Sequence, residues 1–274
     1  MLKFAPIDAH RRKASAMRHL RFQPRPVIGQ AAVTATTDLD DKGVHLLADC
    51  SALLERDSAL VEQLSAQGSD GWDWQGSNLL ESDEILNQNV PTYRLGLNPA
   101  LLDVAEAYLG EPCFYMGCSL KREEVGPFTG GTRQWHLDIE DDRMLRIIIY
   151  LNDVQDGGGP FQYIDAARSR LARSRLDYQS GYLSDAVMRT VIDEDRWASA
   201  YGCPGMIVAF DGTRVFHRVA RPEVASRFSL SLTYTSRYPR HVFRQVRLRS
   251  SSFRAVYPDL SERERACLPT PRWF

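Results

Sequence analysis

The chain has few cysteines, no cysteine-pair motif and almost no net charge, and these absences exclude several classes of protein. Its five cysteines are scattered through 274 residues without a Cys-x-x-Cys pair. That pattern argues against a disulfide framework or a zinc cluster and favours a reducing compartment. The formal net charge is −1, and the apolar and charged fractions are those of an ordinary globular protein. No internal repeat or low-complexity segment is present.

The sequence also lacks a long hydrophobic segment. Its longest apolar run, around Arg146–Leu151, has the length of a strand and is far too short to span a bilayer. The N-terminus has no hydrophobic stretch of the secretory kind. Because it is rich in arginine and nearly free of acids, a mitochondrial presequence is an alternative. We expect a cytoplasmic protein without a membrane span.

Positive charge is concentrated in three segments, although basic and acidic residues nearly balance over the whole chain. Residues 1–25 contain a single acid, Asp8, and a second basic run covers 237–254. The third cluster consists of Arg168, Arg170, Arg173 and Arg175. Such runs most often only solvate a surface or pair with acids, here those of 38–62. The alternative is attraction of an anionic substrate or partner.

The first part of the chain predicts helices, and no second domain is indicated. Residues 1–37 lack periodicity and predict an irregular basic arm, followed by a single domain at 38–274. The expected elements are a strand at Gly43–Leu47, a helix at about Ser51–Gln67, a long loop at 69–97, and a helix that begins at Asn98-Pro99 and ends at Gly110.

From residue 112 onward, short alternating segments separated by glycine and proline predict strands. These are Cys113–Arg122, Gln134–Asp138, Arg143–Leu151, Pro160–Ile164, Gly205–Phe210, Val215–Val219, Arg227–Ser236 and Val242–Leu248. We therefore expect a mainly β fold, an antiparallel jelly roll or double-stranded β-helix, with the N-terminal helices buttressing one sheet. A segment inserted at about 166–200 is expected to carry a helix near Ser184–Ile192.

A histidine and an aspartate stand two residues apart in the segment RQWHLDIEDD, residues 133–142. On a strand, residues i and i+2 point to the same side, so His136 and Asp138 could reach one point and hold a metal ion. A chance His-x-Asp is common, however, so the motif alone is weak evidence. A metal site needs a further ligand from elsewhere in the chain.

His217 is the best-placed further ligand. It follows a strand and the tight turn at Asp211-Gly212, and a jelly roll brings such a strand beside others that are distant in sequence. The other histidines have less specific settings: His10 and His19 in the basic arm, His45 before two leucines, and His241 in the second basic run.

The strand that starts at Arg227 has one apolar and one polar face. Phe228, Leu230 and Leu232 alternate with Ser229 and other polar residues. A polar face inside a barrel-like fold needs polar partners or a ligand.

Together these segments resemble the phytanoyl-CoA dioxygenase family of iron(II)- and 2-oxoglutarate-dependent oxygenases. The resemblance covers about residues 40–240 and rests on the order of several motifs. These are Trp135-His136-Leu137-Asp138, Ile149–Val154, Gly159-Pro160-Phe161, Gly205–Gly212 leading to His217, and then Arg227.

The resemblance implies that His136, Asp138 and His217 bind iron(II), leaving positions for 2-oxoglutarate and dioxygen. It also implies that Arg227 clamps the distal carboxylate of 2-oxoglutarate, because a guanidinium binds a carboxylate through two parallel hydrogen bonds. The implied reaction is hydroxylation of an unactivated C–H bond in a small organic substrate, with release of succinate and carbon dioxide.

Further contacts are expected from neighbouring strands. Ser229 should face the same way as Arg227, and Ser119 and Lys121 lie on a strand that family members use for co-substrate and substrate contacts. Arg146 stands alone in an apolar strand, where an unpaired cation is costly, so it should face either 2-oxoglutarate or an acidic residue. Lys121 and Arg146 could equally lie at the surface.

The insert arginines Arg168, Arg170, Arg173 and Arg175 could form a rim that attracts an anionic substrate. The alternative is that the insert is simply exposed to solvent.

Two departures from the family pattern bear on substrate contacts. Phe161–Ile164 leads into Asp165 and the insert rather than into a Pro-Gly-Ser-His segment, and Val219 replaces a polar residue of some relatives. The carboxylate at Asp138 argues against halogenation, since related halogenases have a small residue there.

Two rival interpretations remain open on the sequence. One is a non-catalytic jelly-roll protein that binds an anionic partner, although the chain lacks the interleaved aromatic and basic residues of a single-strand nucleic-acid platform, so nucleic acid is not an expected partner. The other is a cupin-like metal dioxygenase that does not use 2-oxoglutarate, against which Arg227 argues. The expected partner is a small-molecule substrate, and the sequence does not indicate an oligomeric state.

Overall fold

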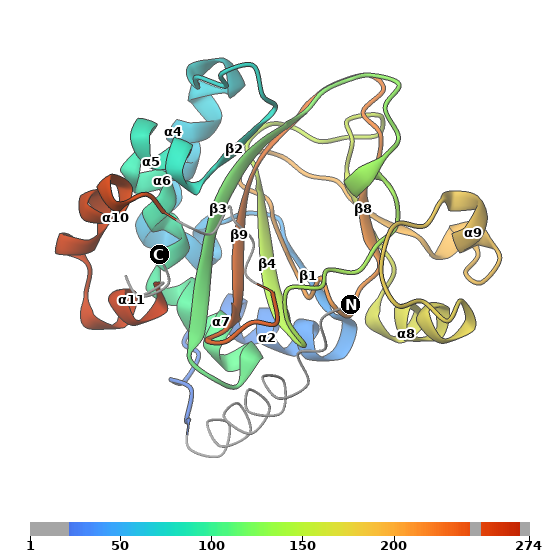
Figure 1. The fold of residues 1–274 in the computed structure, drawn as a ribbon, viewed down its shortest axis with the longest axis horizontal. Helices are drawn as coiled ribbons and strands as arrows, with labels where there is room; N and C mark the ends of the chain where they lie inside the picture. Colours follow the sequence, from blue (N-terminus) through green and yellow to red (C-terminus); the bar gives the residue numbers. More distant parts are fainter. Residues whose placement is uncertain (1–21, 242–247, 269–274) are drawn as a thin grey trace.

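The computed structural model describes residues 22–241 and 248–268 (Figure 1). Three expectations therefore lie outside the described residues: most of the basic arm with His10 and His19, the strand at Val242–Leu248 apart from Leu248 itself, and the middle of the second basic run. Within the described ranges, no helix combines the length and apolar character that crossing a membrane requires.

Two antiparallel sheets form the centre of the molecule. The larger has six strands in the order β1-β7-β4-β9-β3-β2, and the smaller has three in the order β6-β5-β8. The strands of the larger sheet are β1 (Val44–Leu47), β2 (Leu79–Glu81), β3 (Cys113–Glu123), β4 (Met144–Tyr150), β7 (Ile207–Phe210) and β9 (Arg227–Ser236). Those of the smaller are β5 (Phe161–Tyr163), β6 (Ala198–Ala200) and β8 (His217–Val219). The expected jelly roll is confirmed.

Helices cover the outer face of the larger sheet. In Figure 1, α4, α5, α6, α10 and α11 lie on one side of strands β3, β9 and β4, and β8, α8 and α9 lie on the other. The α-helices are α2 (Gln30–Lys42), α3 (Ser51–Leu54), α4 (Ser58–Gln67), α5 (Ser82–Gln88), α6 (Val90–Arg94), α7 (Pro99–Leu109), α8 (Ala166–Arg175), α9 (Asp185–Arg189), α10 (Ser250–Val256) and α11 (Glu262–Cys267). Short 3₁₀ segments are η1 (Glu55–Asp57), η2 (Ser69–Gly71), η3 (Leu95–Leu97), η4 (Gly131–Arg133), η5 (Glu194–Arg196) and η7 (Tyr257–Asp259).

Alternation along the central strands separates two apolar layers. On β4, Ile147 and Ile149 belong to the core that packs against the helices, together with Leu230 of β9. Ile148 and Tyr150 face the opposite way, into a smaller core between the two sheets. A strand points successive side chains to opposite faces, so one apolar strand contributes to both layers. The inner layer is where polar residues of β4 and β9 can meet a ligand.

Helix α7 begins and ends where its sequence signals predict. The Asn98 side chain accepts a hydrogen bond from the Ala100 N–H, Pro99 occupies the first turn, and Gly110 ends the helix in the left-handed conformation. Gly68 likewise ends α4, and its N–H donates to the Leu64 carbonyl. The helix expected at Ser51–Gln67 is, however, interrupted by η1.

The structure corrects several other expected elements. The segment 69–97 is not a long loop: it contains β2, α5 and α6, which are too short for periodicity to identify. Gln134–Asp138 is not a regular strand, since Trp135 pairs only with Leu183 and His136 only with His217, in single bridges. The expected boundary of the basic arm at residue 37 falls inside α2, whose Leu39 is fully buried.

Replacing Leu230 with alanine should destabilise the fold substantially. The side chain is fully buried between the larger sheet and the helices, and such truncations cost about 2–5 kcal/mol. A Val224→Ala change provides the control, because Val224 is 81% exposed and surface changes usually stay within about 0.5 kcal/mol. Urea unfolding of both variants measures the difference, and equal midpoints would contradict this placement of the core.

Candidate metal centre

Two histidines and one aspartate converge between the sheets. The ligand atoms of His136, Asp138 and His217 all lie within 4.8 Å of one another. Asp138 Oδ1 is 3.9 Å from His136 Nε2 and 3.7 Å from His217 Nε2. Two atoms that share an ion at about 2.1 Å each lie about 3–4 Å apart. The three side chains are therefore arranged to hold one metal ion.

Backbone carbonyls orient both imidazole rings. His136 Nδ1 lies 2.9 Å from the Gln134 carbonyl oxygen, and His217 Nδ1 lies 2.9 Å from that of Val215. A carbonyl oxygen can only accept, so each Nδ1 carries the proton and donates it. The two Nε2 atoms then keep free lone pairs that face Asp138. This is the arrangement by which proteins fix the tautomer of a metal-binding histidine.

Burial keeps the two imidazoles neutral. It lowers the pKa of His217 to about 3, with a further contribution from the neighbouring His136. Burial also lowers the pKa of His136, although Asp138 acts in the opposite direction. Near neutral pH both rings are therefore free to act as ligands without losing a proton.

Asp138 is held from both sides. Its Oδ2 pairs with Arg146 Nε at 2.7 Å, and its N–H donates to the Gly212 carbonyl at 2.8 Å. Arg146 also bonds Glu140 through Nη2 at 2.6 Å. Burial alone would raise the pKa of Asp138, but Arg146 and the two histidines bring it below its ordinary value. Asp138 is thus an anion that directs Oδ1 at the histidines.

Gly212 leaves the space that the aspartate carboxylate occupies. A Cβ atom built at this position would overlap Oδ2 and crowd the rest of the Asp138 side chain. Glycine is therefore required here by close approach, in the turn that precedes His217.

A second group of metal-capable residues fits a metal poorly. Glu106, Cys113 and Cys267 lie close together, but Arg263 already bonds the Glu106 carboxylate at 2.7 Å. The neighbouring Cys267 thiol and burial raise the pKa of Cys113 well above its usual value. A thiol must lose its proton to bind a metal, so this cluster is better explained as a buried ion pair beside two thiols.

A cavity of about 550 Å³ opens over the triad. Both sheets, the segment that carries His136 and Asp138, and residues 180–182 of the insert contribute its walls. Of the sequence-predicted contacts, Ser119, Lys121, Arg146 and Arg227 line it together with the three ligands. Ser229 is 1% exposed and is not among the lining residues, whereas Ser231, on the same face of β9, is.

Arg227 is buried with part of its guanidinium free. Its Nη1 donates to the Gly159 carbonyl at 3.0 Å, and its side chain is only 2% exposed. Within the described residues, its Nε has no hydrogen-bond partner. A buried cationic donor without a partner is costly, and a ligand carboxylate in the cavity would satisfy it.

Charge around Arg227 is positive on balance. Glu123 pairs with Lys121 and Arg133 and lies opposite Arg227 on the neighbouring strand. Although burial raises it, the pKa of Glu123 is lowered overall by Lys121, Arg227 and Arg133. One carboxylate thus faces three cations at this end of the cavity.

The insert arginines do not line this cavity. They are exposed on α8, where Arg168 pairs with Asp165 and Arg175 donates to the Val191 carbonyl. Arg170 and Arg173 border a separate hollow of about 250 Å³. Helix α8, which follows β5, therefore does not place these four arginines over the triad.

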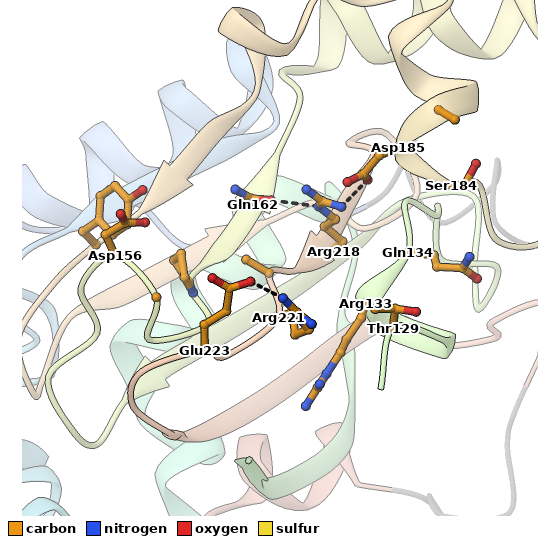
Figure 2. Close-up of a pocket in the computed structure, with 15 residues that line it drawn as sticks. Thr129, Arg133, Gln134, Asp156, Gln162, Ser184, Asp185, Arg218, Arg221 and Glu223 are labelled. Atoms are coloured by element: carbon orange, nitrogen blue, oxygen red, sulfur yellow. Dashed lines mark hydrogen bonds and ion pairs between the residues drawn. The ribbon is translucent and has the colours of Figure 1, made fainter. Parts of the chain in front are cut away.

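A polar hollow of about 540 Å³ lies beside the metal cavity, and Arg218 lines both. Figure 2 shows Arg218 reaching between Gln162 and Asp185, and Arg221 paired with Glu223. The Arg218 guanidinium also lies over the Trp135 ring, 4.6 Å from its centroid. Its charge is thus balanced within the protein, which gives this hollow a structural rather than an anion-binding character.

Three features of the site were not predicted from the sequence. Glu140 and Glu81 both line the cavity, and Gly212 leaves space for the Asp138 carboxylate. Glu140 could have been suspected, because it stands two residues after Asp138 in the same motif. The other two depend on contacts between distant segments, for which the sequence carries no local signal.

No family model matches the chain, and no curated protein matches it. Solved structures do. EctD from S. alaskensis, solved with 2-oxoglutarate and 5-hydroxyectoine, is 20% identical over 79% of this chain and 82% of its own, with a TM-score of 0.50. EvdO2 from Micromonospora carbonacea var. aurantiaca is 15% identical over 82% of this chain and 100% of its own, with a TM-score of 0.53. The non-heme alpha ketoglutarate dependent epimerase SnoN from nogalamycin biosynthesis is 12% identical over 75% and 83%, with a TM-score of 0.51. At these identities the likeness establishes a shared fold.

A Gly212→Ala change should weaken metal binding without unfolding the protein. The added methyl group displaces the Asp138 carboxylate, and disturbing the support of a metal ligand typically lowers affinity by about 10–100-fold. Gly126→Ala is the matched control, since a Cβ there meets no atom within 4 Å. Calorimetric titration with Co(II) measures both variants. Unchanged Co(II) affinity in Gly212→Ala would contradict the close approach.

Proposed function

We propose that the protein is an iron(II)- and 2-oxoglutarate-dependent oxygenase, similar to the phytanoyl-CoA dioxygenase family, that hydroxylates a C–H bond of a small organic substrate. One observation carries the proposal: a His-Asp-His triad and a buried, partly unsatisfied Arg227 line the same cavity. The triad suits iron(II), because two imidazoles and one carboxylate on one side of the ion leave further positions open.

The bound iron would supply the oxidative chemistry, in which one oxygen atom of dioxygen enters succinate as 2-oxoglutarate loses carbon dioxide and the other enters the C–H bond of the substrate. The protein residues have binding and orienting roles. His136, Asp138 and His217 hold the metal through Nε2, Oδ1 and Nε2. Arg146 and Glu140 fix the aspartate in place, and Phe161 and Phe210 form an apolar wall that limits water.

Arg227 binds the distal carboxylate of the co-substrate in this proposal. The surplus of positive charge around Glu123 supports the assignment, since an entering carboxylate would balance it. A metal dioxygenase that does not use a 2-oxo acid would have no co-substrate carboxylate to balance this positive charge. Two structural neighbours add support by analogy, since EctD was solved with 2-oxoglutarate and SnoN is an alpha ketoglutarate dependent epimerase.

We further propose that the protein works in a reducing compartment, with the cytoplasm as the simplest choice. All five cysteines are free thiols, including the exposed Cys203. Their persistence as thiols is expected where glutathione keeps cysteines reduced.

His217→Ala should abolish formation of succinate from 2-oxoglutarate. The change removes one of three metal ligands, and the remaining pair holds iron(II) much more weakly. His45→Ala is the control, because His45 lies on β1 and pairs with Asp38 outside the cavity. Succinate release is measured with iron(II), ascorbate and 2-oxoglutarate. Full turnover by His217→Ala would refute the metal assignment.

Arg227→Ala should raise the apparent KM for 2-oxoglutarate by at least about tenfold, since a charge-assisted hydrogen bond contributes about 1.5–3 kcal/mol. Arg196→Ala removes the same charge at a side chain that is 57% exposed, and it should leave KM unchanged. Steady-state titration of 2-oxoglutarate tests both variants. An unchanged KM in Arg227→Ala would place the clamp elsewhere.

A further inference from the structure

Four residues of the cavity wall lie in one row across the larger sheet. Glu81 of β2 is paired with Ser119 of β3, Ser119 with Ser231 of β9, and Ser231 with Ile148 of β4. All four line the cavity. Neighbouring strands are about 4.8 Å apart, so this row spans the width of the cavity floor. Glu81 stands at its outer end, on the edge strand.

Among the described residues Glu81 has no ion-pair partner, unlike the other acidic residues of the wall. Asp138 and Glu140 both pair with Arg146. In the described ranges, no lysine, arginine or histidine nitrogen lies within 4.0 Å of the Glu81 carboxylate. Its local role is to begin α5, in a capping box with Glu84. A capping box uses backbone N–H groups and leaves the charge of the carboxylate uncompensated.

The surroundings of Glu81 disfavour its charged form. Burial, followed by repulsion from Glu84, raises the pKa of Glu81 to about 7, although Arg146 partly opposes the shift. A half-buried carboxylate of this kind gains most from a cation that enters beside it. Carboxylates whose pKa is strongly shifted in this way are common at binding and catalytic sites.

We propose that Glu81 is the specificity-determining residue of the cavity and that the substrate carries a cationic nitrogen, such as an ammonium, amidinium or guanidinium group. The proposal rests on the oxygenase function proposed above. It divides the cavity into an anion-binding end at Arg227, for the co-substrate, and a cation-binding end at Glu81, for the substrate. The hydroxyls of Ser119 and Ser231 lie between the two ends and can orient polar groups.

The mouth of the cavity is compatible with a cationic ligand. Tyr182 lines it with 54% of its side chain exposed, and its ring centroid is 5.2 Å from that of His136. An aromatic face attracts a cation as well as an apolar group. The lining cations Lys121 and Arg218 are paired with Glu123 and Asp185, so they do not oppose such a ligand strongly.

The experiment compares matched cationic and neutral probes. Wild-type protein loaded with Zn(II) and 2-oxoglutarate, which cannot turn over, is titrated calorimetrically with benzamidinium and with benzamide, and then with n-butylammonium and n-butanol. We expect each cation to bind at least about tenfold more tightly than its neutral partner, as for a partly desolvated charge pair. Glu81→Gln keeps an oxygen that can cap α5 but removes the charge, so it should abolish the preference.

Glu124→Gln is the matched control. Glu124 is exposed, pairs with Arg122 and does not line the cavity, so this variant should retain the preference for the cations. Equal or tighter binding of the neutral probes to the wild type overturns the proposal. So does a preference that persists in Glu81→Gln, or a failure of both cations to bind.

A second readout is the pH dependence of benzamidinium binding. Below pH 7 Glu81 is largely protonated and neutral, so affinity should rise with pH between about 6 and 8 as the proton is lost. The other charged groups facing Glu81 are Glu84 on α5, Arg146 on β4 and the Lys121–Glu123 pair on β3. Because these remain in Glu81→Gln, a flat profile in that variant assigns the dependence to Glu81, and an unchanged slope excludes it.

Succinate formation separates this proposal from the one on which it rests. Wild-type protein with iron(II) and 2-oxoglutarate that forms succinate but shows no preference for cations retains the proposed function and loses only the role of Glu81. Protein that forms no succinate fails the proposed function, whatever its affinity for cations.

Discussion

The ion pair between Arg146 and Asp138 connects the larger sheet to the candidate metal centre. Arg146 is fixed in the centre of β4, and its Nε lies 2.7 Å from Asp138 Oδ2. Asp138 belongs to an irregular segment with no ladder of its own, so this pair and the Gly212 contact determine where its carboxylate points. His217 follows the same turn as Gly212. The position of the Asp138 carboxylate therefore depends on a half-buried arginine and on the absence of a side chain at Gly212.

The cavity over these ligands is electrostatically divided. At one end, Lys121, Arg133 and Arg227 surround a single carboxylate, Glu123. At the other, Glu81 has no partner of opposite charge in the described part of the chain. A dicarboxylate and a cation could occupy such a cavity together, because each end attracts one charge and repels the other. In the proposed oxygenase, this arrangement would give the co-substrate and the substrate separate places.

The long strands were predictable, because alternation is a local property of the sequence, and the order of motifs along the chain was enough to bring together the three candidate metal ligands. The face of β4 that carries Arg146 and the polar face of β9 follow from the two-residue period alone. Elements such as β2 and α5 were not, since three to seven residues carry no clear period. The contacts of Glu81, which ends β2 and precedes α5, could therefore not be predicted either. The surroundings of Arg168, Arg170, Arg173 and Arg175 were not predictable for a related reason: charge density indicates an exposed helix but not which cavity it borders.

The most direct test of the account is a crystal structure of the protein grown without oxygen in the presence of iron(II) and 2-oxoglutarate. We predict anomalous scattering from one iron at bonding distance, about 2.1 Å, from His136 Nε2, Asp138 Oδ1 and His217 Nε2, with the distal carboxylate of 2-oxoglutarate on the Arg227 guanidinium. Iron bound instead at Glu106, Cys113 and Cys267, or a 2-oxoglutarate carboxylate that does not contact Arg227, would contradict it.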